Sequence, residues 1–281
     1  MNYRLGLIGF PIQQSLSPWI HQQFLKQAGL EGDYCLFEIA PDRPFEKEIS
    51  RVKNEQLDGF NVTVPYKKRI IDCLDDLDED ARAIGAVNTA VQRNGKWIGC
   101  NTDWIGYTTG LKHHYPSIFQ NTTSSILLIG AGGAARGIFY GLMKEGFTRI
   151  DIANRTQSSA EAIAALARTN THTSVITLQE AENRLAQYDL IVQTTNIGMK
   201  PNVTDTIISL EQLHEDSIVS DIVYQPLNTE FLHQASQKGA SIHYGHTMLL
   251  YQARTAFELW TSKQVPVDDM DEQLKRKLEG S

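Results

Sequence analysis

The sequence predicts an α/β protein of two domains, and three observations lead to this fold class. Its 281 residues are enough for about two domains that each bury a core of their own. From about residue 125 to residue 243, apolar runs of strand length alternate with helical patterns, which is typical of a parallel sheet covered by helices. Within that stretch, the apolar run 126–129 passes directly into glycines and then into a helix.

This glycine-rich turn satisfies a known spacing. Gly130, Gly132 and Ala135 match GxGxx(G/A), in which the glycines permit a tight turn and a close backbone approach to a pyrophosphate. The phosphates would lie against the free N–H groups at the positive end of the following helix. Because the pattern follows a buried strand and opens a helix, it predicts a Rossmann-type dinucleotide-binding domain. Its candidate cofactor-binding residues are Gly130, Ala131, Gly132, Gly133 and Ala134.

The end of the next strand indicates which dinucleotide is bound. That strand, residues 149–153, is followed by Asn154, Arg155 and Thr156. An NAD site usually has a carboxylate there, whereas Arg155 can form paired hydrogen bonds with a 2′-phosphate, with Asn154 and Thr156 adding further ones. The sequence therefore predicts NADP. Taken singly, Arg155 could instead be a solvated loop charge and Thr156 a helix N-cap.

The composition excludes several classes of protein. A hydrophobic content of 41% and a charged content of 21% are those of a soluble globular protein. The net charge of −7 argues against a general nucleic-acid or membrane surface, and no apolar run approaches membrane-spanning length. Three cysteines without CxxC pairing suit the cytoplasm. The eight histidines form no HExxH or Cys/His set, so we expect no metal site.

The N-terminal hundred residues also mix strands and helices. Pro65 must close a strand, since it has no N–H to donate to a ladder. Asn94 and Gly95 predict the turn of a β-hairpin. The acidic residues 72–80 indicate an exposed turn and helix start. The predicted strands cover residues 3–9, 34–39, 57–64, 84–91 and 97–100, and the predicted helices cover residues 18–28, 43–53 and 104–112.

Polar residues stand at the ends of these strands. Ser17 is well placed to cap the helix that Pro18 begins, but this leaves Ser15 unexplained, and the two hydroxyls could equally hold a polar ligand. Thr63 and Lys67 follow a strand's carboxyl end, where α/β sheets bind ligands. Lys67 also fits an ordinary solvated helix start, in a run of three basic residues.

Three further polar residues are candidates for a ligand site or are unexpected where they stand. Asn88 interrupts an apolar strand. Asp103 could be a ligand contact or the cap of the next helix. Gln252, on a final helix that Gly245 opens, could contact a ligand or lie exposed beside that helix's apolar stripe.

The remaining elements follow the βα alternation. The predicted strands cover residues 174–177, 188–193, 218–224 and 241–243, and the predicted helices cover residues 134–145, 158–168, 179–186, 229–238 and 268–278.

A set of motifs stands in a fixed order along nearly the whole chain. They are Ser15-x-Ser17, Asn61-Val-Thr63-Val-Pro65-x-Lys67, Gly85-Ala-Val-Asn88-Thr, Asn101-Thr-Asp103, the glycine turn, Asn154-Arg155-Thr156, Gly198-Met199, Asp221-x-Val-Tyr224-x-Pro226 and Gly245-x-x-Met248-Leu249-x-x-Gln252. Together they resemble the shikimate/quinate dehydrogenase family. The chain departs from the family's usual residues at Trp104, commonly Gly, and at Asn196, often Pro, which leaves the local loop shape open.

The resemblance implies an N-terminal α/β substrate domain, residues 1–103 plus 244–281, and a Rossmann-type NADP-binding domain, residues 104–243. It implies reversible, NADPH-dependent reduction of 3-dehydroshikimate to shikimate, with Lys67 and Asp103 as the catalytic pair. The implied substrate-binding residues are Ser15, Ser17, Thr63, Asn88, Tyr224 and Gln252. The expected cofactor-binding set adds Asn154, Arg155, Thr156, Thr194, Gly245 and Met248 to the glycine turn.

Elementary chemistry agrees with this implication. Hydride transfer to a ketone produces an alkoxide, which needs a proton donor as the charge develops. A lysine ammonium can supply the proton, and a carboxylate can orient it. Two alternatives stay open, an NAD-linked quinate/shikimate dehydrogenase and a non-catalytic dinucleotide-binding regulator. We expect a small-molecule substrate, no nucleic-acid or membrane partner, and a monomer or homodimer.

Overall fold

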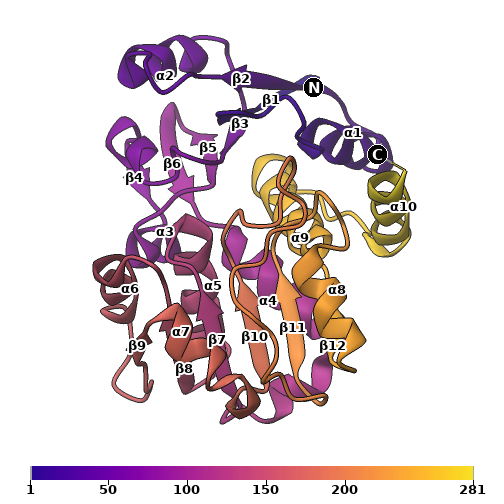
Figure 1. Cartoon of the computed structure of the whole chain (residues 1–281). Helices are drawn as coiled ribbons and strands as arrows, with labels where there is room; N and C mark the ends of the chain where they lie inside the picture. Colours follow the sequence, from indigo (N-terminus) through magenta and orange to yellow (C-terminus); the bar gives the residue numbers. More distant parts are fainter. Residues whose placement is uncertain (1, 281) are drawn as a thin grey trace. The chain divides into compact units, whose positions relative to one another are not determined.

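The computed structural model describes residues 2–280, and its contacts divide the chain into two compact units (Figure 1). Unit 1 comprises Met1–Asp103 and Gln252–Val267, and unit 2 comprises Trp104–Tyr251 and Asp268–Ser281. Each unit contains one six-stranded sheet. The predicted α/β fold class is confirmed.

The contact grouping and the expected domain division differ near the C-terminus. Residues 244–251 and 268–281 group with unit 2, whereas we expected all of residues 244–281 in the substrate domain. The contacts explain this grouping. Gly245 lies so close to the backbone of Ile222 that an added Cβ would be 2.5 Å from it, and His246 Nε2 lies 3.2 Å from Asp271 Oδ1. The expected division remains a prediction.

Unit 1 is built on a mixed sheet with strand order β2-β1-β3-β5-β6-β4. Strand β1 pairs in parallel with β2 and β3, while β5 is antiparallel to both β3 and β6. The second half of α9 belongs to this unit. The elements are β1 (Asn2–Gly9), α1 (Ser17–Gln27), β2 (Glu31–Glu38), α2 (Phe45–Lys53), β3 (Gly59–Val62), η1 (Arg69–Cys73), β4 (Asp76–Leu77), α3 (Glu79–Ile84), β5 (Thr89–Arg93), β6 (Lys96–Cys100) and α9 (Gly245–Thr261).

The two faces of this sheet bury separate apolar clusters. One cluster joins Phe60 of β3 to Phe45 and Ile49 of α2. The other joins Leu5 and Leu7 of β1 to residues of α9 that include Trp260, whose indole N–H donates to the carbonyl of Ala90 at 3.0 Å. Both faces of the central strands are thus covered, as their apolar sequences require.

The hairpin strand is shorter than predicted at its first end. We expected residues 84–91 to be extended, but Ile84 ends helix α3. The helix begins at the N-cap Asp78, whose side chain accepts from the Ala81 N–H, and it stops at Gly85, which is left-handed at φ 68°. These two caps define a helix where the apolar pattern suggested a strand. The predicted turn at Asn94 and Gly95 is confirmed, with φ 52° and 77°.

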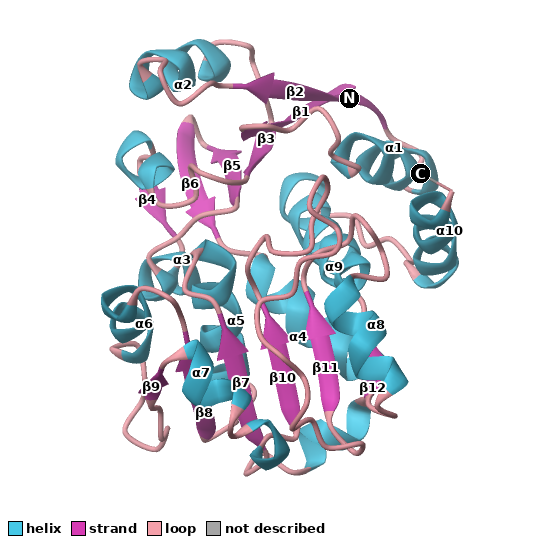
Figure 2. Cartoon of the chain, in the orientation of Figure 1, coloured by secondary structure: helices cyan, strands magenta, loops and turns pink. Residues whose placement is uncertain are grey.

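Unit 2 has an entirely parallel sheet with strand order β12-β11-β10-β7-β8-β9 (Figure 2). The order reverses between β7 and β10, which is the switch point of a Rossmann fold. The strands are β7 (Ser125–Ile129), β8 (Arg149–Ala153), β9 (Val175–Ile176), β10 (Leu190–Gln193), β11 (Ile218–Asp221) and β12 (Ser241–His243). The helices are α4 (Asp103–His114), η2 (Pro116–Gln120), α5 (Gly133–Lys144), α6 (Gln157–Ala164), α7 (Leu178–Glu182), η3 (Leu185–Gln187), α8 (Glu230–Gln237), the first part of α9, and α10 (Asp268–Glu279).

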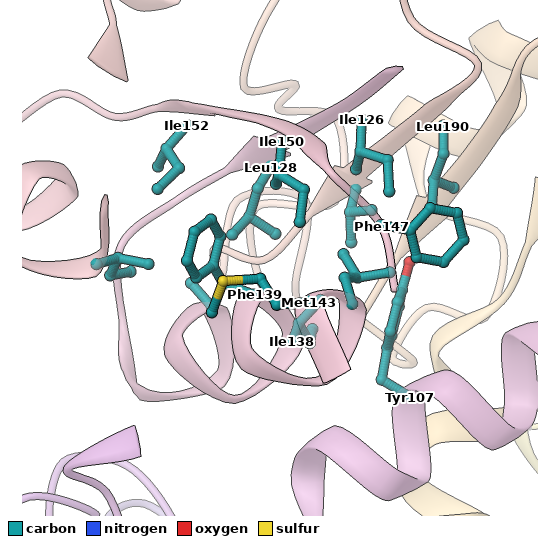
Figure 3. Packing of buried hydrophobic residues seen from close by; sticks show 14 of the residues in the cluster. Tyr107, Ile126, Leu128, Ile138, Phe139, Met143, Phe147, Ile150, Ile152 and Leu190 are labelled. Carbon is teal, nitrogen blue, oxygen red and sulfur yellow. The ribbon is translucent and has the colours of Figure 1, made fainter. Parts of the chain in front are cut away.

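Alternate residues of the unit 2 strands serve opposite faces. Ile126 and Leu128 pack in one cluster with Phe139 of α5 and Tyr107 of α4 (Figure 3). The intervening Leu127 packs in a second cluster that includes residues of α7 and α8. This double burial explains why residues 126–129 of β7 are all apolar.

Strand β11 ends three residues earlier than predicted. The carboxylate of Asp221 accepts the N–H of Val223 at 2.9 Å, so the chain turns there. The segment that contains Tyr224 is therefore a loop.

Candidate active site

Lys67 and Asp103 form an ion pair in unit 1. Lys67 follows β3 and Pro65, and Asp103 follows β6 and begins α4. Lys67 Nζ lies 2.6 Å from Asp103 Oδ2, and the two side chains are only 15% and 5% exposed. Lys67 is therefore not a solvated charge at a helix start, although its neighbour Lys68 is exposed. A shielded pair of this kind is held more firmly than a surface ion pair.

Asp103 is the first residue of α4. The carboxamide oxygen of Asn101 accepts the Asp103 N–H at 3.1 Å. Both carboxylate oxygens of Asp103 accept from side chains, Oδ2 from Lys67 and Oδ1 from Asn88 Nδ2 at 2.9 Å. Asp103 thus joins a buried polar cluster, and its role toward a ligand remains a prediction.

Asn88 connects the pair to other polar residues. Its Nδ2 also lies 2.9 Å from Thr102 Oγ1 and 3.3 Å from Gln252 Oε1, while its Oδ1 accepts the Thr102 N–H at 2.7 Å. Asn88 and Thr102 are buried and Gln252 is half-buried. The anomaly that Asn88 presented in an apolar strand is thus explained by a buried polar network, and Gln252 is part of it.

The predicted hydroxyl residues lie where β1 and β3 end. Ser17 is the first residue of α1, whose N-cap is Leu16, so the interpretation of Ser17 as the N-cap is wrong. The Ser17 N–H donates instead to Ser15 Oγ at 3.2 Å. Thr63 continues β3 with an N–H bond to the carbonyl of Ile8. Its methyl group packs so closely on Gly9 that a Cβ there would be 2.3 Å away.

Two glycines set the shape of the turn between β7 and α5. Gly130 has φ 112°, and a Cβ added there would lie 2.4 Å from Thr194 Oγ1, so only glycine fits. Thr194 in turn donates to the carbonyl of Ile129 at 2.7 Å. Gly132 is the N-cap of α5, and a Cβ there would meet nothing within 4 Å. The backbone at Gly132 is therefore open to a ligand at a helix N-terminus.

A side-chain hydrogen bond of Asn154, the first residue of the loop after β8, stabilises that loop. Asn154 Nδ2 donates to the carbonyl of Thr156 at 2.8 Å. Thr156 stands at the N-cap position of α6 as its alternative interpretation required, but its side chain makes no capping bond. Arg155 and Thr156 are both exposed. The side chains at this strand end are available to a ligand.

Three other predicted residues also belong to unit 2. Gly245 has a packing reason to be glycine, because it lies against the backbone of Ile222, and Met248 is buried in a core cluster. Tyr224 is half-buried in the loop after β11. Their predicted ligand contacts remain predictions.

Comparison with known proteins gives the family. Three family models match in order, the shikimate dehydrogenase substrate binding domain over residues 7–90, the shikimate/quinate 5-dehydrogenase model over residues 115–222 and the shikimate 5′-dehydrogenase C-terminal domain over residues 245–275. Shikimate dehydrogenase (NADP(+)) of Oceanobacillus iheyensis is 52% identical over 280 residues, which cover 100% of each chain. The chain belongs to the shikimate dehydrogenase family.

Solved structures of shikimate dehydrogenases also match the whole chain. One, a complex with NADP+, has a TM-score of 0.90 at 36% identity and covers 99% of this chain and 96% of its own. Another, from Thermus thermophilus in complex with NADP(H) and shikimate, has a TM-score of 0.85 at 30% identity and covers 98% and 99%. The folds of these structures match that of the present chain over nearly its whole length, and the predicted family is confirmed.

Two further findings concern the described chain. Within residues 2–280, no three His, Cys, Asp or Glu side chains gather in a way that could hold a metal ion. No helix in the same range has the length and hydropathy needed to cross a bilayer.

Sequence reasoning did not assign a role to several polar residues around the pair. Asn61, Thr89 and Thr102 are buried and hydrogen-bonded to Asn88 or to one another. Asp221 in unit 2 is also fully buried. Burial raises its pKa to about 7, although hydrogen bonds from Val223, Thr229 and Gln193 act to lower the pKa. The available signal was the same in each case, a polar residue in or beside an apolar strand.

Proposed function

We propose that this protein catalyses the reversible, NADPH-dependent reduction of 3-dehydroshikimate to shikimate, with Lys67 as general acid and base and Asp103 as its partner. The shielded ion pair at 2.6 Å supports the proposal, because a lysine ammonium held by a carboxylate suits proton transfer, and Lys67 lies within the residues that match the substrate binding domain model. The family relation supports the substrate and the cofactor.

The chemistry assigns one task to each group. The bound cofactor supplies the hydride that reduces the ketone carbon. As negative charge develops on the ketone oxygen, Lys67 Nζ donates a proton to it and becomes neutral. In the oxidation direction, neutral Lys67 accepts the proton of the hydroxyl. Asp103 Oδ2 holds Nζ in position, and Asn88 holds the other carboxylate oxygen.

We propose that six polar residues hold the substrate's hydroxyls and carboxylate. They are Ser15, Ser17, Thr63, Asn88, Tyr224 and Gln252. Support comes from unit 1, where Asn88 and Gln252 share the network of Asp103, and where Ser15 and Ser17 follow β1 and Thr63 directly follows the neighbouring strand β3.

We propose the turn Gly130–Gly133 with Ala134 as the pyrophosphate site, and Arg155 with Asn154 and Thr156 as the 2′-phosphate site. The open space at Gly132 and the exposed guanidinium fit these two groups. Thr194, Gly245 and Met248 complete the proposed cofactor set.

We further propose a cytoplasmic enzyme that is a monomer or homodimer. The free thiols of Cys35, Cys73 and Cys100 suit a reducing compartment.

A steady-state assay tests the proposal. Shikimate and quinate are each offered with NADP and with NAD, and absorbance of the reduced cofactor is followed. Turnover with shikimate and NADP is expected. A preference for quinate or NAD would favour the alternative enzyme, and no turnover in any combination would favour a regulator.

The catalytic role is tested by Lys67→Ala, which is expected to lower kcat by at least about a hundredfold. The control is Lys96→Ala, which removes an exposed lysine from the hairpin of the same unit. If Lys67→Ala kept the kcat of the control, Lys67 would not be the proton donor.

A further inference from the structure

A buried tyrosine of unit 1 is hydrogen-bonded to the polar network around Asn88, although it stands on β2, which does not pair with the strand that it contacts. Tyr34 is on β2 and is 8% exposed. Its hydroxyl donates to Asn61 Oδ1 at 2.7 Å, although β1 stands between β2 and β3 in the sheet. Leu5 of β1 is opposite Tyr34, and Leu7 is opposite Asn61. The Tyr34 side chain therefore reaches diagonally across β1 on one face of the sheet.

Asn61 continues the connection toward the ion pair. Its Nδ2 lies 3.2 Å from the carbonyl of Asn88 and 3.0 Å from Thr89 Oγ1. Thr89 Oγ1 donates to Asn88 Oδ1 at 3.2 Å, and Asn88 Nδ2 donates to Asp103. An unbroken series of hydrogen bonds thus runs from the Tyr34 hydroxyl to the carboxylate that holds Lys67.

The other side of Tyr34 faces α1. Burial raises the pKa of the Tyr34 hydroxyl, which therefore stays protonated and able to donate. The His21 ring is stacked on the Tyr34 ring, with centroids 4.5 Å apart and planes within 5°. Burial lowers the pKa of His21 to about 3, against the influence of Asn61, so the ring is neutral and acts as a packing surface.

We propose that Tyr34 is a positioning residue, which holds the Ser17 end of the substrate site in register with the Lys67–Asp103 end. Tyr34 does not need to touch the substrate to do so. Its ring is stacked on His21 of α1, and its hydroxyl donates to the side chain of Asn61, so Tyr34 connects helix α1 to the polar network. The inference rests on the proposed function, because it assumes that Ser17 and Lys67 act on the same substrate.

A purely structural role makes a different prediction. If the hydroxyl only satisfied a buried polar group, its removal would lower stability without a selective effect on the substrate. If it positions the site, removal lowers kcat/KM for shikimate and leaves KM for NADP unchanged. One lost hydrogen bond with its displaced partner corresponds to a decrease of about tenfold.

The test is Tyr34→Phe, assayed well below its melting temperature. The matched control is Tyr66→Phe, because Tyr66 is also buried in unit 1 and its hydroxyl donates to the carbonyl of Ile39 at 2.6 Å, outside the network. We expect both variants to lose stability, and only Tyr34→Phe to lose about tenfold in kcat/KM for shikimate. Equal kinetics in the two variants would overturn the proposal.

Wild-type activity and a second variant separate failure of the proposed function from failure of the positioning role. If wild-type protein fails to turn over shikimate with NADP, the proposed function fails. If wild-type protein is active and Tyr34→Phe matches it, only the positioning role fails. Should Tyr34→Phe not fold, Thr89→Val breaks the same series at another residue with little change in volume, and it must show the same selective loss for the proposal to stand.

Discussion

Asp221 offers a measurable link between burial and stability. Its carboxylate accepts hydrogen bonds from Gln193 and Val223 at Oδ1 and from Thr229 at Oδ2, at 3.2, 2.9 and 2.8 Å. Burial nevertheless raises its pKa from 3.8 to about 7. In the variant Asp221→Asn, the amide oxygen can replace Oδ1, and the Thr229 hydroxyl can turn to accept from the amide N–H. The variant therefore removes the titration while keeping the shape.

The direction in which pH changes the stability follows from the number of protons that the folded and unfolded states bind. Between pH 4 and pH 7, the folded state keeps a proton on Asp221 that the unfolded state has lost, so stability falls as pH rises through this window. The largest slope is about 1.4 kcal/mol per pH unit. Across the window, the wild type should lose on the order of a few kcal/mol relative to Asp221→Asn, and above pH 7 the difference should become constant.

Urea denaturation of both proteins from pH 5 to pH 8, followed by circular dichroism, measures this difference. All other titrating groups are common to the two proteins, so each pH provides its own control. A difference in unfolding free energy that stays flat from pH 5 to pH 8 would refute the reasoning, because Asp221 would then titrate outside that range.

Three other substitutions test packing and the cofactor site. Gly59→Ala would place a Cβ 2.0 Å from Trp260 Nε1, so we expect a loss on the order of 3 kcal/mol, measured as a lower melting temperature; an unchanged value would contradict the packing. Gly132→Ala meets no neighbour, so thermal stability should be kept while the Kd for NADP, measured by calorimetry, rises about tenfold or more; unchanged affinity would argue against a pyrophosphate there. Arg155→Ala should lower kcat/KM for NADP by about tenfold to a hundredfold and leave that for NAD unchanged, and an equal loss with both cofactors would remove the 2′-phosphate assignment.

The sequence by itself determined the elements whose causes are local. The apolar run of β7, the glycine turn and helix α5 follow one another within about twenty residues, and each depends on its own composition. The same applies to the hairpin turn at Asn94 and Gly95. Where a strand pattern and helix caps overlapped, the prediction was wrong. Residues 84–91 were predicted as a strand, but the caps at Asp78 and Gly85 define a helix that ends at Ile84.

Only the tertiary structure decided which polar residues meet. Lys67 and Asp103 are 36 residues apart, and Asn88 and Gln252 are 164 residues apart. Their contacts depend on the strand order β2-β1-β3-β5-β6-β4, which no local pattern encodes. The same order lets Tyr34 reach Asn61 across β1. Sequence patterns could name the residues at the strand ends, but hydrogen bonding between distant segments requires the sheet that brings those segments together.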